Sequence, residues 1–179
     1  ALDGLVEVSG YRTPTKTRIL GGAPHAIKQQ IVRYDVEDAL AVSEGLGAEL
    51  LSRMKLSARA AQGAIVSDYG YGAVAPAIVD PLRAALPAGA RICVDSRHRL
   101  GEYRGVDAAT PNEEELEEHA GAALSESDER LASAGRALRE AMGCPCLLVT
   151  RGSRGMAVFD DGAAPSWIPV HGTDQVADV

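Results

Sequence analysis

Short apolar runs that end in polar or glycine residues recur along this chain of 179 residues, and they constrain its fold more than any other feature. Segments with helical content separate four such runs, which are residues 64–66, 91–94, 107–110 and 146–150. Apolar strands that alternate with helices are typical of a parallel sheet with helices on both faces. The sequence therefore predicts an α/β fold.

The remaining segments divide into helices and further strands. Helical spacing or content is found in residues 43–54, 74–86, 112–119 and 127–142. Ser43 is placed as an N-cap, and Pro76 and Pro81 predict a break near the start of the second helix. Strand patterns are found in residues 5–8, 16–20, 28–34, 156–159 and 167–170, the last two as a hairpin.

The charge balance excludes two classes of partner. The net charge is −7, and the arginines are scattered among acidic residues. Binding to nucleic acid or to an anionic membrane surface needs clustered positive charge, so we expect neither partner. No run approaches the roughly 18 apolar residues of a membrane span. The first residues lack the pattern of a signal peptide, and we expect a cytoplasmic protein.

The three cysteines, Cys93, Cys144 and Cys146, follow no regular framework. An odd count without such a framework argues against a disulfide-stapled secreted domain. No second Cys or His pair accompanies Cys144 and Cys146 at zinc spacing. We interpret all three as small buried or loop thiols.

Polar or glycine residues follow four of the expected parallel strands. In open α/β sheets, ligands bind beyond the carboxyl ends of the strands. The polar tips at these ends are residues 67–70, 95–97, 110–112 and 150–152. The sequence therefore predicts one shared ligand site at this edge of the sheet.

The last of these tips begins a glycine-containing loop over residues 150–155. Gly152 and Gly155 would let a phosphate approach backbone N–H groups closely, and Thr150 offers a hydroxyl donor. An ordinary glycine-rich turn explains the same residues. The loop is not a P-loop, because the Lys-Ser/Thr ending is missing.

Two further tips carry oxygen-bearing side chains. Asn112 and Glu115 have the spacing of a capping box at a helix start, and the same pair suits Mg²⁺, which takes oxygen ligands and keeps several waters. Asp68 and Asp95, with Arg97 nearby, follow neighbouring strands. Both aspartates could cap strand ends, or they could orient a substrate hydroxyl or a metal-bound water.

Basic residues on the expected N-terminal strands also have two interpretations. Lys16 and Arg18 lie on one strand and Arg33 lies on the next. Together they could contact an anionic substrate, but surface charges explain them equally well. The residues alone leave this choice open.

The order of these motifs resembles that of the PfkB, or ribokinase-like, carbohydrate kinases. Within that family, the chain is most similar to the heptose 7-phosphate kinase domain of ADP-heptose synthesis, and the likeness covers most of its length. The motifs that carry the resemblance are Ser-Asp-Tyr-Gly at 67–70, Thr-Pro-Asn-Glu-Glu-Glu at 110–115 and Val-Thr-Arg at 149–151 through Gly155, together with residues 15–20, 28–33 and 103–105.

This resemblance implies a ribokinase-like α/β fold with a mostly parallel sheet, helices on both faces and a small β lid from strands in residues 11–35. It implies ATP and Mg²⁺ as cofactors and a homodimer formed through the lid strands. The implied reaction transfers the γ-phosphoryl group of ATP to a hydroxyl of a sugar or sugar phosphate. The expected acceptor is the anomeric hydroxyl of D-glycero-D-manno-heptose 7-phosphate.

The same resemblance assigns roles to individual residues. It implies that Asn112 and Glu115 arrange Mg²⁺, largely through water. The ATP phosphates would be bound by these two residues and by Thr150, Gly152 and Gly155. Substrate contacts would come from Asp68, Asp95 and Arg97.

The chain departs from the family pattern at two motifs. Tyr71 stands where the family has lysine, and Ser96-Arg97 stands where it has Pro-Lys. These departures leave open a related kinase for ribose, fructose or a nucleoside, or a non-catalytic nucleotide-binding domain. The family's catalytic loop, with its general base, would follow Val179. We therefore expect residues 1–179 to be one partial kinase domain, inactive by itself, without its N-terminal part.

Overall fold

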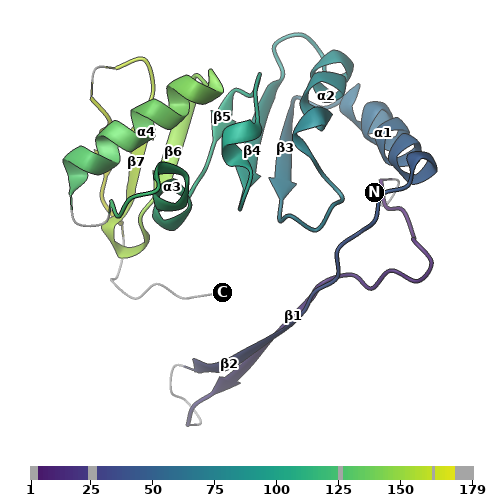
Figure 1. Ribbon diagram of the computed structural model, residues 1–179, viewed down its shortest axis with the longest axis horizontal. Coiled ribbons are helices and arrows are strands. Elements are labelled where there is room, and N and C mark those ends of the chain that lie inside the picture. The colour runs from purple at the N-terminus through teal and green to yellow at the C-terminus, as the bar shows by residue number, and fades with distance from the viewer. Residues whose placement is uncertain (1–3, 24–27, 125–126, 163, 172–179) are drawn as a thin grey trace.

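The apolar runs pair into one six-stranded sheet in the computed structural model of the chain, which describes residues 4–23, 28–124, 127–162 and 164–171 (Figure 1). In spatial order the strands are β3 (Gly63–Asp68), β4 (Arg91–Ser96), β5 (Ala108–Ala109), β6 (Cys146–Thr150), β7 (Met156–Phe159) and β8 (Ser166–Ile168). Neighbours from β3 to β6 are parallel, whereas β7 and β8 are antiparallel. The predicted α/β fold and the hairpin near its end are confirmed.

The helices begin and end where local sequence signals place them. Their bounds are α1 Glu44–Ala58, α2 Val79–Ala85 after the 3₁₀ turn Pro76–Ile78, α3 Glu113–Ala120 and α4 Asp128–Met142. The Ser43 hydroxyl accepts a hydrogen bond from the Leu46 N–H at 3.3 Å, which confirms its role as an N-cap. Gly121 and Gly143 end α3 and α4 in the left-handed conformation, which glycine adopts without steric cost.

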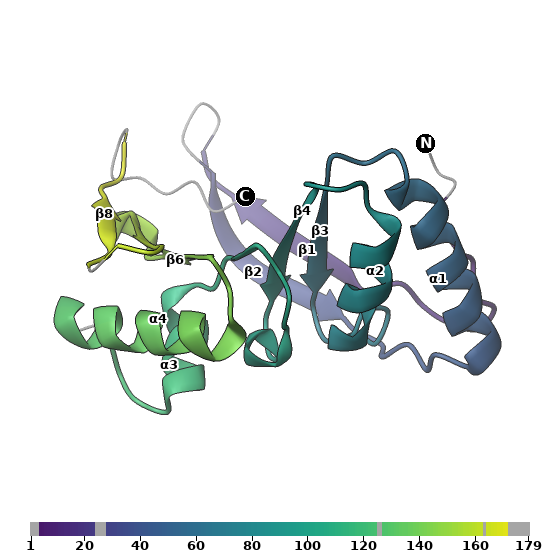
Figure 2. The same ribbon diagram turned by 90° about the horizontal axis from the view of Figure 1, so that it is seen from above.

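All four α-helices lie on one side of the sheet in both views (Figures 1 and 2). The core between the layers includes Ile92 and Leu147 from the strands and Leu116, Leu131 and Leu138 from the helices. On the opposite face, among the described residues, no helix covers the sheet, and Ile65 of β3 is 80% exposed. We expected helices on both faces of the sheet, and within the described residues they cover one of the two faces.

Two strands form a separate antiparallel hairpin, β1 (Thr15–Gly21) with β2 (Gln29–Val36), as the N-terminal strand patterns predict. The expected strand at residues 5–8 is wrong, because this segment has no strand partner in the described part of the chain. The Leu5 carbonyl instead accepts a hydrogen bond at 2.7 Å from the Arg53 guanidinium of α1. In Figure 1 the hairpin extends away from the sheet, on the side toward which β3 and β4 point.

None of the described helices combines the length and the apolar character that a membrane crossing would need. The longest two, α1 and α4, each have 15 residues. A helix that crosses the hydrocarbon core needs about 20 predominantly apolar residues.

Candidate functional site

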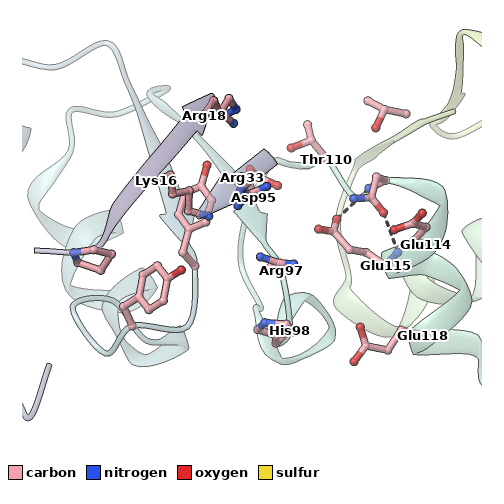
Figure 3. Close-up of a pocket in the computed structure, with 15 residues that line it drawn as sticks. Lys16, Arg18, Arg33, Asp95, Arg97, His98, Thr110, Glu114, Glu115 and Glu118 are labelled. Carbon is pink, nitrogen blue, oxygen red and sulfur yellow. Dashed lines mark hydrogen bonds between the residues drawn. The ribbon is translucent and has the colours of Figure 1, made fainter. Parts of the chain in front are cut away.

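A cavity of about 1000 Å³ opens between the hairpin and the carboxyl edge of the parallel strands (Figure 3). Its lining includes the tips that follow β4, β5 and β6, the first two turns of α3, and one face of the hairpin. Of the predicted site residues, five line the cavity: Asp95, Arg97, Asn112, Glu115 and Thr150. Tyr69 of the 67–70 tip after β3 also lines the cavity, so the predicted convergence of strand ends holds for all four tips.

The tips after β5 and β6 are joined directly by the backbone. Asn112 and Thr150 form a parallel β-bridge, and the Thr150 N–H donates to the Pro111 carbonyl at 2.9 Å. This pairing continues the β5–β6 ladder past the end of β5 to the last residue of β6. It holds the start of α3 beside the start of the 150–155 loop.

Asn112 and Glu115 form the predicted capping box. The Asn112 side-chain oxygen accepts from the Glu115 N–H at 2.8 Å, and a Glu115 carboxylate oxygen accepts from the Asn112 N–H at 2.9 Å. Within the described residues, the second carboxylate oxygen of Glu115 makes no hydrogen bond, and Glu115 lines the cavity. The capping role and a ligand-binding role are therefore compatible in the same side chains.

Carboxylates make the α3 side of the cavity electronegative. Burial is the main cause that raises the pKa of Glu115; the Asn112 N–H opposes this rise, and the negative charge of Asp95 adds to it. Burial also raises the pKa of Asp95. A divalent cation between these carboxylates would favour their charged forms.

The donor set fits Mg²⁺ better than it fits a metal held entirely by protein. Among the residues that the structure describes, no group of three or more His, Cys, Asp or Glu side chains could hold a metal ion. Mg²⁺ is commonly held by one or two carboxylates, several waters and substrate phosphates. Asn112 and Glu115 supply two oxygen-bearing side chains at the cavity wall, which is the kind of donor set that such a site uses.

The 150–155 loop contributes unequally to the cavity. Thr150 lines it, but Gly152 and Gly155 do not. Gly155 has a φ of 83°, and a side chain there would collide with the Ile168 carbonyl of β8. Its N–H donates to the Gly152 carbonyl at 3.1 Å. Gly155 thus closes the loop against β8, whereas Gly152 faces open space.

Asp68 has a different environment from the other predicted substrate contacts. Its side chain is only 2% exposed and is not part of the cavity wall. Its carboxylate accepts hydrogen bonds from the Arg99 guanidinium at 2.9 Å, the Tyr103 hydroxyl at 2.9 Å and the Ser96 hydroxyl at 3.0 Å. The structure thus gives Asp68 the role of joining β3 to the segment after β4, not a place at the cavity.

The pKa of Asp68 reflects these contacts. Burial alone would raise it, but the hydrogen bonds from Arg99, the Gly70 N–H, Tyr103 and Ser96 outweigh burial and lower it. The carboxylate is therefore held in its charged form. An aspartate held this way anchors structure, because its oxygens are already occupied by protein donors.

Basic side chains line the hairpin side of the cavity, opposite α3. Lys16, Arg18 and Arg33 share one face of the hairpin, and Arg97 follows β4 (Figure 3). Arg18 and Arg33 are direct cross-strand partners, an arrangement that is unfavourable for like charges. Arg33 also binds Asp35 in a two-fold contact at 2.9 and 2.6 Å. The cavity thus has a cationic wall and an acidic wall.

Tyr71, which departs from the family pattern, connects the hairpin to the sheet. Its hydroxyl bonds the Glu37 carboxylate, which raises the pKa of Tyr71, and its carbonyl accepts from the Leu40 N–H at 2.7 Å. Its ring stacks on Tyr69 with centroids 6.5 Å apart. Tyr69 in turn lies 5.4 Å from the Lys16 ammonium group. This aromatic pair fixes the position of the hairpin over the cavity.

Sequence reasoning missed other residues of the cavity wall. These are Pro14, Tyr71, His98, Glu114 and Glu118, whereas Tyr69 and Thr110 lie within the predicted tips at 67–70 and 110–112. Helical spacing could have identified Glu118, since it lies one turn beyond Glu114 and Glu115 on the same face of α3. The contribution of Pro14 had no such signal, because it depends on where the hairpin lies.

The sequence is similar to one segment of several larger bacterial proteins. No protein-family model matches the chain. The bifunctional protein HldE of Paramagnetospirillum magneticum is 35% identical over 156 residues, which are 86% of this chain and 31% of that protein. HldE of Chromohalobacter salexigens is 34% identical over 167 residues, which are 90% of this chain and 33% of that protein. The chain thus spans about a third of the length of the curated relatives that it matches.

Solved structures with the same fold come from sugar kinases. Phosphofructokinase-2 from Escherichia coli in complex with fructose-6-phosphate matches 78% of this chain and 46% of its own, with a TM-score of 0.58 at 19% identity. Ribokinase from Arabidopsis thaliana complexed with ribose and ATP matches 84% of this chain and 47% of its own, with a TM-score of 0.55 at 18% identity. At these identities the similarity establishes the ribokinase-like fold.

Proposed function

The chain is a homologue of part of the bifunctional protein HldE and has the ribokinase-like fold, and on that premise we propose that it serves ATP- and Mg²⁺-dependent phosphoryl transfer to a sugar or sugar phosphate. The observation that carries this proposal is the Asn112–Thr150 bridge, which brings the two expected nucleotide motifs to one cavity. The opposite wall of that cavity is cationic. A phosphate donor and an anionic acceptor could therefore bind face to face.

The residues of this cavity would act by positioning. Phosphoryl transfer depends mainly on holding donor and acceptor in line and on stabilising charge. The Thr150 hydroxyl would donate to an ATP phosphate, and Asn112 and Glu115 would hold Mg²⁺, largely through its waters. When bound, Mg²⁺ would offset the negative charge of the phosphates.

The proposed acceptor is D-glycero-D-manno-heptose 7-phosphate, phosphorylated at its anomeric hydroxyl. The motif resemblance supports the heptose, and the cationic wall supports an acceptor that carries a phosphate. Lys16, Arg18 and Arg33 reach the cavity from the hairpin, and Arg97 lies between them and α3 in Figure 3. Asp95 and Arg97 would contact the acceptor.

We further propose that residues 1–179 form part of one kinase domain, with strands β1 and β2 as its lid. The resemblance supports a general base beyond Val179, and residues 176–179, which resemble the approach to that loop, lie outside the described residues. The outer face of the hairpin supports a homodimer, because Ile19 and Val32 are cross-strand neighbours that are 52% and 46% exposed there.

The proposal is tested with the complete protein, in which the expected N-terminal part and catalytic loop accompany residues 1–179, together with ATP, Mg²⁺ and a panel of acceptors: heptose 7-phosphate, fructose 6-phosphate, ribose and a nucleoside. ADP release and the phosphorylated product are measured for each. We expect the highest kcat/KM with heptose 7-phosphate and no turnover after Mg²⁺ is chelated. Failure to phosphorylate any acceptor, together with failure to bind ATP, would refute the proposed function. A preference for another acceptor would refute only the heptose assignment.

A further inference from the structure

A buried arginine, Arg151, belongs to the 150–155 loop but does not line the cavity. The side chain of Arg151 is 6% exposed, although the residue directly follows the end of β6. Arginine is almost never this deeply buried unless it is paired. Its burial therefore implies that charged or aromatic partners surround its guanidinium group.

Three elements surround the Arg151 guanidinium. Its Nη2 atom donates to the Asp128 carboxylate at the first residue of α4, at 2.6 Å. Its central carbon, Cζ, lies 4.8 Å from the centroid of the Trp167 ring in β8. Its Nε atom lies 3.8 Å from the Glu113 carboxylate at the first residue of α3. The arginine thus ties the loop to the starts of two helices and to an edge strand.

Glu113 connects this cluster to the cavity. It lies between Asn112 and Glu115 in the first turn of α3, but its own side chain is buried and does not line the cavity. Its second oxygen binds the Arg154 guanidinium, so two arginines of the same loop meet one carboxylate. A movement of the loop would therefore act on the helix turn that carries Asn112 and Glu115.

The contact between Arg151 and Glu113 is incomplete. Among the described residues, Arg151 Nε and Glu113 Oε1 are the buried side-chain polar atoms without a hydrogen-bond partner. They face each other at 3.8 Å, whereas an N–H···O bond needs roughly 3 Å. Buried polar groups are usually bonded, and the low dielectric inside a protein strengthens the bond once it forms. A shift of the loop toward α3 by roughly 0.8 Å would complete it.

We propose that Arg151 is a positioning residue that closes the 150–155 loop onto α3 when a nucleotide phosphate binds, through its contact with Glu113. This inference rests on the proposed function, because it assigns the phosphate to the Thr150 side of the cavity. Closure forms the Arg151–Glu113 hydrogen bond and brings the Thr150 hydroxyl and the Asn112 turn onto the same phosphate. Arg151 touches neither substrate.

The test compares R151K, R151M and E113Q with the wild type, all in the complete protein that includes the expected catalytic loop. Lysine keeps the charge of arginine but loses the planar fork, so it fails to reproduce the contacts with Glu113, Asp128 and Trp167 together. We expect R151K and R151M to raise KM for ATP about tenfold and to leave KM for the sugar unchanged. A purely structural role would lower the melting temperature without this split between the two KM values.

A double-mutant cycle tests the contact itself. The variant R151M/E113Q should weaken ATP binding no more than the worse single variant, because R151M removes the donor of this contact and E113Q removes the negative charge that strengthens it. R136M is the matched control, because Arg136 is an exposed arginine of α4. This variant should bind the ATP analogue as tightly as the wild type does. Binding is measured by calorimetry with a non-hydrolysable ATP analogue, and folding by circular dichroism.

The outcomes separate the two proposals. If the wild-type chain binds no ATP analogue, the proposed function fails and this inference fails with it. If the wild type binds and R151K binds as tightly, the proposed function stands and the role of Arg151 is refuted. Additive losses in the double variant would also refute it. If R151M does not fold, R151K and E113Q still decide the result.

Discussion

Asn112, beyond the end of β5, and Thr150, the last residue of β6, are paired in a parallel β-bridge, and the Thr150 N–H donates to the Pro111 carbonyl at 2.9 Å. Two motifs that lie far apart in the sequence are therefore one rigid unit at the cavity wall. A backbone connection of this kind leaves the side chains of both residues free to face a ligand. The proposed nucleotide site depends on this pairing.

The first prediction separates catalysis from capping at the start of α3. Asp is as good an N-cap as Asn, and Gln keeps the capping box that Glu115 forms. N112D and E115Q should therefore change the free energy of unfolding by about 1 kcal/mol or less. Both should lower kcat markedly, because they alter the charge around the proposed Mg²⁺. Urea unfolding and steady-state kinetics check the two effects, and unchanged kcat in both variants would remove these residues from the mechanism.

The second prediction concerns the two glycines of the 150–155 loop. Both have positive φ, which costs an alanine about 1–2 kcal/mol. G152A should lose about that much stability, because its new Cβ meets open space. G155A should lose more, since its Cβ would also collide with the Ile168 carbonyl. Chemical denaturation of both variants measures the difference, and equal losses would contradict the close packing of Gly155 on β8.

The sequence predicts the sheet and most of the site well, because local signals and the parallel topology agree. Apolar runs mark the strands, and Ser43, Asn112 and Ser127 mark the helix starts that the structure contains. Since parallel strands end at one edge, the tips at Asn112 and Thr150 had to come close together. These features depend on short stretches of chain or on a general rule of topology.

Other features depend on contacts that no local pattern encodes. The position of the hairpin follows from the Tyr71–Glu37 bond and from the stacked tyrosines, which join distant parts of the chain. Asp68 looked like a site residue because it follows a strand, but Arg99 and Tyr103 from a later segment occupy its oxygens. A strand-end aspartate gives the same signal in the sequence whether it faces a cavity or a buried arginine.

The third prediction uses the lowered pKa of Asp68. A carboxylate whose pKa is lower in the folded state stabilises that state above its ordinary pKa of about 3.9, and this stability is lost as the pH falls toward the folded-state value. D68N should therefore cost about 3–5 kcal/mol at pH 7, because it leaves Arg99 without its carboxylate. Below about pH 4 the difference in the free energy of unfolding between D68N and the wild type should become smaller.

Urea unfolding at pH 7 and at acid pH measures this dependence. D161N is the matched control, since the Asp161 side chain is 97% exposed and pairs with Arg139 at the surface. Exposed pairs of this kind contribute little, so D161N should be close to wild type at both pH values. A gap for D68N that stays constant with pH would show that its loss does not come from the charge.

The fourth prediction concerns Arg18 of the hairpin, whose replacement should weaken substrate binding but increase stability. Arg18 faces Arg33 directly across the two strands, and removing one of two opposed like charges should stabilise a hairpin by about 0.2–1 kcal/mol. R18Q should therefore raise the stability slightly. It should also raise KM for a phosphorylated acceptor, with less effect at high salt, and leave KM for ATP unchanged. R12Q, an exposed arginine outside the cavity wall, is the control, and an equal effect in both variants would argue against a specific anion contact.

The last prediction concerns the outer face of the hairpin. Ile19 and Val32 oppose each other there, on the face away from Lys16 and Arg18, and a two-stranded hairpin with an exposed apolar face is marginal by itself in water. Pairing with the same face of a second chain would bury both residues and hold the hairpin over the cavity. V32D should then convert a dimer to a monomer and raise KM for the acceptor, because the hairpin loses its support.

Sedimentation measures the oligomeric state of the wild type and of V32D across a range of concentrations. L56D is the matched control, because Leu56 of α1 is equally apolar and 63% exposed but lies on a different element. The control should keep the oligomeric state of the wild type, since a charge on α1 does not touch the hairpin. A wild-type chain that stays monomeric at all concentrations, or a V32D variant that still dimerises, would show that something other than self-association stabilises this hairpin.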